Sequence, residues 1–134
     1  MPKIAFSVSG LPPTKNEAKS LLAEGHPHAG RVRALLEAAA EAITQGAQPI
    51  ERGEIELELV VFGPRQAPSD ATNYLGGIGD VLQAKAPAPL IEHLGPLAQV
   101  HLFTNDRQIR EIHYQEERGS ETHYWLSIRP RSGS

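Results

Sequence analysis

The clearest periodic pattern along the chain predicts a helix over residues 30–45. Its apolar residues recur three or four positions apart, the spacing that gathers side chains on one helical face. They are Val32, Leu35, Leu36, Ala39 and Ile43. Gly46 follows directly, in the position where many helices end with a left-handed glycine. We therefore expect an amphipathic helix with one face on the core.

Strict alternation of polar and apolar residues predicts a strand over residues 54–62 (EIELELVVF), with its glutamates facing solvent and its aliphatic side chains facing the core. Residues 3–8 (KIAFSV) predict a first strand, which the following Gly-Leu-Pro-Pro ends. Residues 108–117 and 121–129 flank Gly119-Ser120 and predict a terminal hairpin. Between the helices and this hairpin, residues 86–99 predict a loop with a short helical turn around Leu90–His93, and VHLF (100–103) follows as a strand-like apolar run.

A second helix is expected from about Asn73 to about Lys85, with Thr72 as its N-cap. This segment holds three glycines, Gly76, Gly77 and Gly79. Each glycine inside a helix costs roughly 1 kcal/mol relative to alanine, so an offsetting reason is expected. Gly77, together with Asn73 and Asp80, lies beside the apolar face, where glycine would let a polyanion or another backbone come close.

Length and composition are typical of one globular domain, which we expect to cover residues 1–134. The predicted elements make it an α/β (α+β) domain with two main helices and a frayed tail from about residue 130. It has 134 residues, of which 40% are hydrophobic and 22% charged. The absence of cysteine excludes disulfides, thiol nucleophiles and cysteine-ligated metals. No apolar run reaches the roughly 18 residues of a membrane helix, and the first residues lack a secretory signal, so we expect a cytoplasmic protein.

Charge is distributed unevenly around the net value of −3. Residues 1–35 carry five Lys or Arg against two Glu, whereas residues 36–104 carry three against nine acidic residues. This leaves room for a basic surface near the N-terminus within an overall acidic protein.

Two aspartates are candidates for a metal site. Asp70 precedes the second helix, and Asp106 follows the VHLF run in TNDRQI. An acid at a strand end that faces an acid at a helix entry is a common way to hold Mg²⁺, which prefers oxygen ligands. An N-terminal cap at Asp70 and a surface ion pair between Asp106 and Arg107 are the structural alternatives.

Three motifs, taken together, resemble the RusA-type Holliday junction resolvases, which cut four-way DNA junctions with Mg²⁺. They are Pro12-Pro13-Thr14-Lys15-Asn16 after the first strand, Asp70-Ala71-Thr72-Asn73 leading to Asp80, and Asn105-Asp106-Arg107-Gln108-Ile109 before the last strands. Their order and spacing cover nearly the whole chain. The resemblance implies a small mixed β-sheet with two main helices, and a homodimer, because two symmetric cuts require two sites.

The resemblance also implies roles for particular residues. Asp70 and Asp106 would be Mg²⁺ ligands, Asp80 would assist catalysis, and Asn73, Thr72 and Asn105 would support the site. The DNA-contacting residues would come from the early loop and helix: Lys15, Asn16, Lys19, Arg31 and Arg33.

Three positions depart from the family pattern, because Thr72 and Asn105 replace aspartates and Gly76 replaces a catalytic lysine. Fewer anionic ligands weaken Mg²⁺ binding, and the loss of a lysine removes stabilisation of charge on the transferred phosphate.

Two other classes of function therefore stay open. One is a non-catalytic module that binds nucleic acid or protein on the same fold, with Gly76 and Gly77 marking the approach of a partner backbone. The other is a small-molecule or metal-binding protein that uses its acids and histidines. For a metal-binding protein, His26-Pro27-His28 offers two imidazoles in a predicted loop. His113 and His123 lie on the two strands of the predicted hairpin, and the sequence does not determine the register between these strands.

Overall fold

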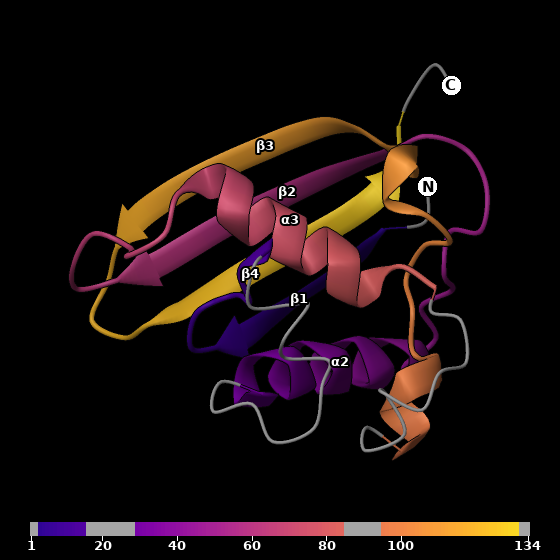
Figure 1. Ribbon diagram of the computed structural model, residues 1–134, viewed down its shortest axis with the longest axis horizontal. Helices are drawn as coiled ribbons and strands as arrows, with labels where there is room; N and C mark the ends of the chain where they lie inside the picture. The colour runs from indigo at the N-terminus through magenta and orange to yellow at the C-terminus, as the bar shows by residue number, and fades with distance from the viewer. Residues whose placement is uncertain (1–2, 16–28, 85–94, 132–134) are drawn as a thin grey trace.

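The computed structural model describes residues 3–15, 29–84 and 95–131, which form one mixed sheet with two helices on one of its faces (Figure 1). The elements are β1 (Ile4–Ser9), α2 (Ala29–Thr44), β2 (Ile55–Gly63), α3 (Ala71–Leu82), the 3-10 turn η2 (Asp106–Gln108), β3 (Ile109–Arg118) and β4 (His123–Pro130). The predicted fold class, a small mixed sheet with two main helices, is confirmed. No helix in the described part of the chain is long and apolar enough to cross a membrane.

The sheet has the order β1-β4-β2-β3, with β2 parallel to β3 and antiparallel to β4 (Figure 1). The predicted terminal hairpin is therefore wrong: both of its strands exist, but β2 lies between them. Polarity explains the order. β4 buries Tyr124, Leu126 and Ile128 and takes an inner position, whereas β3 (IREIHYQEER) has few apolar residues and takes an edge, where charged side chains also discourage pairing with other chains.

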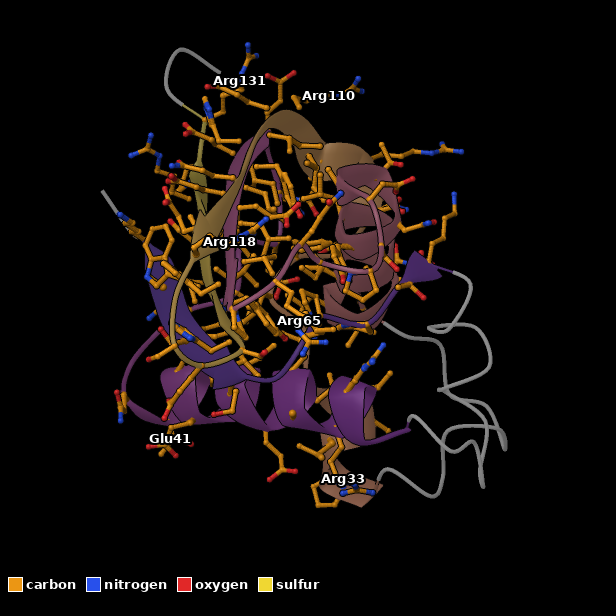
Figure 2. All side chains as sticks on the ribbon, turned by 90° about the vertical axis from the view of Figure 1, so that its left-hand side faces the viewer. Arg33, Glu41, Arg65, Arg110, Arg118 and Arg131 are labelled. Atoms are coloured by element: carbon orange, nitrogen blue, oxygen red, sulfur yellow. The ribbon has the colours of Figure 1, made fainter. Side chains whose placement is uncertain are left out.

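One face of the sheet forms the core together with the helices. Leu57 and Leu59 of β2 pair with Ile128 and Leu126 on one side and with Ile112 and Tyr114 on the other, so all six side chains share a face. Against this face lie fully buried residues of both helices: Val32, Leu35, Leu36, Ala39, Tyr74, Ile78, Val81 and Leu82. In Figure 2 the sheet is seen close to edge-on, with side chains projecting from the opposite face and no described helix covering it.

The start of α3 differs from the prediction by its cap. Asp70, rather than Thr72, is the N-cap, and its carboxylate accepts a hydrogen bond from the Asn73 backbone N–H at 2.9 Å. Thr72 lies inside the first turn, where its hydroxyl donates to the same carboxylate oxygen at 3.0 Å. Aspartate is at least as good a cap as threonine, and its negative charge also favours the helix N-terminus.

Gly77 of α3 is explained by a close approach of the chain's own backbone. A Cβ on Gly77 would lie 2.0 Å from the carbonyl oxygen of Pro13, a distance that no side chain can occupy. The segment that follows β1 therefore packs directly on α3 through Pro13 and Thr14, and the approaching backbone belongs to this chain rather than to a partner. Gly77 is required where it stands.

The VHLF segment is not a strand. Its Leu102 and Phe103 are fully buried, and Phe103 forms only isolated bridges with Ile50 and Gln83. Asp106 consequently begins the 3-10 turn η2 instead of standing at a strand end.

Several predictions fall on residues outside the described ranges, namely those for Asn16, Lys19, His26, His28 and the turn around Leu90–His93. Within the predicted loop, a 3-10 stretch occupies residues 95–99.

The tail is ordered further than expected, because Pro130 belongs to β4 and the Arg131 backbone N–H donates to the Glu54 carbonyl at 2.9 Å. Residues 132–134 lie outside the description.

Replacing Gly77 by alanine should destabilise the protein by about 1–3 kcal/mol, because the added methyl group must displace the Pro13–Thr14 backbone. Gly30→Ala is the matched control, since Gly30 is also helical and a Cβ there would meet no atom within 4 Å. That control should gain stability, by no more than about 1 kcal/mol. Urea unfolding of both variants measures the difference, and equal stabilities would contradict the close approach.

Candidate functional site

The carboxylate of Asp70 is committed to the N-terminus of α3. Its hydrogen bonds from the Asn73 backbone and the Thr72 hydroxyl hold the pKa of Asp70 below its ordinary value, so the group is charged at neutral pH. Thr72 and Asn73 thus contact Asp70, as residues that support it would. The same contacts occur in an ordinary capped helix, so they do not by themselves indicate a metal site.

Asp106 lies against a different part of α3. Its Cβ is 3.5 Å from the position that a Cβ on Gly79 would occupy, and its backbone N–H donates to the Gln83 side chain at 3.2 Å. Asn105 caps η2 by accepting from the Arg107 backbone at 2.8 Å, and Gln108 completes a capping box. A network of hydrogen bonds therefore fixes the backbone that carries Asp106.

Lys15 brings a cation to the same helix. Its Cβ and Cδ are both 3.0 Å from the position of a Cβ on Gly76, so the exposed Lys15 side chain runs across α3 at this glycine. Gly76 and Gly79 are three residues apart and lie on one helical face. We call the surface formed by Lys15, Gly76, Gly79, Asp80 and Asp106 the α3 face.

The two predicted Mg²⁺ ligands are separated along this helix. Asp70 caps the first turn, and Asp106 contacts Gly79, nine residues further, which at about 1.5 Å per residue is about 13 Å along the axis. Among the described residues, Asp70, Asp80 and Asp106 do not form a group of three ligands within reach of one ion. The α3 face therefore offers Asp80 and Asp106 as its acids, with Asp70 at its far end.

The predicted basic residues come from two elements. Arg31 and Arg33 belong to α2, and Arg33 is at the bottom of Figure 2. Of the three predicted DNA-contacting residues that the structure describes, Lys15, Arg31 and Arg33, Lys15 is the one on the α3 face.

A second cluster lies on the uncovered face of the sheet, and the sequence patterns did not reveal it. Glu56 of β2 and Glu111 and His113 of β3 offer three metal-ligating atoms that all lie within 4.8 Å of one another. This group could hold a metal ion. Glu56 was expected to face solvent as part of the alternating strand, but it is only 8% exposed.

An irregularity in the pairing of β2 with β3 aligns this cluster. Ile55 pairs with Ile109, but Glu56 pairs with Glu111, so Arg110 is an extra residue on β3. Such a bulge shifts every following side chain to the other face. Without it, Glu111 and His113 would point toward the core, and no sequence signal marks its position.

Two arginines, Arg129 of β4 and Arg131 directly after it, hold the carboxylates. Arg129 donates to both oxygens of Glu56, at 3.1 and 2.7 Å, and Arg131 donates to Glu111 at 3.2 Å. Arg131 also bonds Glu54 at 2.9 Å. Bonds of this kind are shorter and stronger than neutral ones, so the carboxylates have fixed positions.

The hydrogen bond between His113 and Glu111 raises the pKa of the imidazole, and the pKa of Glu111 is correspondingly lowered by His113 and Arg131. At mildly acidic pH the cluster is consequently an ion-pair network with a protonated His113.

His113 and His123 do project from the same face, because they pair with Glu58 and Phe62 of β2. Four residues of β2 separate these two positions, about 13 Å at the usual strand rise, so the two imidazoles cannot share an ion. His123 instead stacks on Phe62, with ring centroids 4.4 Å apart.

No protein-family model matches this chain, and no curated protein matches its sequence. Its function must be argued from the α3 face and from the cluster on the sheet.

Changing His113 to glutamine should remove a pH-dependent part of the stability. The folded state raises the pKa of His113, so it binds more protons than the unfolded state, and stability falls as pH rises through the raised value. The stability difference between wild type and His113→Gln should be largest near about pH 5.5 and shrink toward about pH 8.5. Urea unfolding at these pH values measures it, with His123→Gln as the control, and a constant difference would contradict the network.

Proposed function

We propose that this chain is a RusA-like, Mg²⁺-dependent endonuclease that acts on branched DNA through its α3 face. The observation that carries the proposal is the placement of Lys15 and Asp106 against α3 at positions three residues apart, Lys15 across Gly76 and Asp106 beside Gly79. The element order also supports it, since a first strand, a proline loop on α3 and an acid before the last two strands follow the order of the RusA motifs.

The residues of the α3 face fit a hard divalent cation. Asp106 and Asp80 supply carboxylate oxygens, which Mg²⁺ prefers, and the exposed surface leaves room for the waters that this ion keeps. When bound, Mg²⁺ would polarise a phosphoryl oxygen and lower the pKa of an attacking water. Lys15 would bind the phosphate and stabilise the charge that develops on it, and the capped turn η2 would keep Asp106 in position.

Electrostatics makes the cation essential to this proposal. The α3 face carries Asp80 and Asp106 with one lysine, and Asp70 adds a further negative charge at the helix start. Such a surface repels a phosphate backbone unless a divalent ion neutralises it. We therefore expect junction binding itself to require Mg²⁺, Mn²⁺ or Ca²⁺.

A second candidate is binding of branched DNA without cutting. Two observations favour it: Asp70 serves as a helix cap, and the neutral Thr72 and Gly76 stand where the family has charged residues. In either form we propose a homodimer, since a four-way junction has two-fold symmetry that a dimer of one site per subunit would match.

The test is cutting and binding of a labelled four-way junction, beside linear duplex, in Mg²⁺, Mn²⁺ and Ca²⁺. Asp106→Asn and Lys15→Ala should each lower junction-selective cutting by at least about tenfold. Asp70→Asn keeps the cap, because asparagine caps as well as aspartate, and should lower cutting less than either. Glu37→Gln, on the exposed side of α2, is the control for the loss of one negative charge.

Each outcome decides between the candidates. Cutting that is lost in Asp106→Asn but kept in Glu37→Gln supports the nuclease. Ion-dependent junction binding without cutting supports the second candidate, and the absence of junction preference in all three ions would overturn both.

A further inference from the structure

We infer that Glu56, Glu111 and His113 form a site for a divalent transition-metal ion on the uncovered face of the sheet, separate from the α3 face. The ion that suits it is Zn²⁺, bound by one imidazole and two carboxylates. This inference does not depend on the proposed nuclease activity.

The positions of the ligand atoms support a single ion. The His113 Nε2 atom lies 2.8 Å from one oxygen of Glu111 and 3.3 Å from one oxygen of Glu56. Ligands on a tetrahedral ion with bonds of about 2.0–2.1 Å are about 3.3 Å apart. The spacing thus needs only small side-chain rotations, and the side of the cluster that faces solvent leaves the remaining positions to water.

The charge of the surroundings also favours a dication. The cluster and its neighbours contain four carboxylates, Glu54, Glu56, Glu58 and Glu111, and two guanidiniums, Arg129 and Arg131, which leaves a net charge of −2 (two positive minus four negative). A protonated His113 neutralises half of this charge. A divalent ion on a neutral imidazole neutralises all of it.

The two arginines can hold the ligand carboxylates in position without preventing these carboxylates from binding an ion. Each carboxylate oxygen can accept a hydrogen bond and still coordinate an ion. Arg129 donates hydrogen bonds to both oxygens of the nearly buried Glu56. Arg131 donates to one oxygen of Glu111, and His113 contacts the other. Hydrogen bonds of this kind fix the orientation of ligand carboxylates in metal sites.

Ligand chemistry separates the two sites of the protein. Imidazole nitrogen suits Zn²⁺ far better than Mg²⁺, which takes oxygen ligands and holds its waters firmly. The sheet site joins β2 to the edge strand β3, so its occupation should hold that edge in register and stabilise the fold.

The test is titration of the full chain with Zn²⁺ by calorimetry, together with thermal unfolding and the absorption spectrum of bound Co²⁺. We expect one site per chain, a melting temperature that rises with Zn²⁺ concentration, and no such rise with Mg²⁺. His113→Ala and Glu111→Gln, both at the accessible edge strand, should each weaken Zn²⁺ binding by at least about tenfold.

Two controls address other histidines. His101→Ala removes an imidazole that also bonds a carboxylate, Glu51 at 3.0 Å, but that belongs to no three-ligand group among the described residues. A double variant, His26→Ala with His28→Ala, removes the two imidazoles of the His26-Pro27-His28 motif, which lies outside the described residues. Both control proteins should bind Zn²⁺ as the wild type does. Binding that survives His113→Ala but is lost in either control would overturn the inference, as would the absence of Zn²⁺ binding to the folded wild type.

Discussion

The contact between the backbone of Pro13 and Gly77 is the constraint on which the arrangement of the candidate site depends. Because α3 lacks a side chain at this position, the segment that follows β1 can lie directly on the helix. Lys15 is then carried across Gly76, and one turn further along α3 Gly79 accommodates Asp106. Glycines that cost helix stability thus let a lysine pass across α3, about one turn from an aspartate that comes from a distant part of the chain.

The central strand β2 gives the protein its second potential site. Its inner side chains form the middle of the core, while on the other face its Glu56 meets Arg129 from β4 and His113 from β3. One sheet therefore separates two surfaces with different ligand chemistry: oxygen donors and an amine on the α3 face, and carboxylates with an imidazole on the other. The two surfaces can be tested independently, since no residue belongs to both.

Local patterns were enough to predict the elements but not their partners. The 3.6-residue period of α2 and the alternation of β2 arise within each segment, so both elements were placed to within about one residue. The position of β4 between β1 and β2 depends on which apolar strands can be buried together. Two strand patterns that flank Gly119 are compatible both with a hairpin and with the observed order, so the sequence pattern alone does not distinguish them. The cluster at His113 depends on the single extra residue Arg110, whose effect on register no local pattern encodes.

The most direct test of the account is a Mg²⁺ titration followed through the backbone amide signals of the labelled protein by NMR. We predict that the largest shifts gather at Gly79, Asp80 and Asp106, where the α3 face offers its two carboxylates. We also predict that they disappear in Asp106→Asn while the remaining spectrum is unchanged. Shifts confined to the Asp70 cap, or no shifts at Mg²⁺ concentrations of about 10 mM, would contradict the placement of the ion on the α3 face.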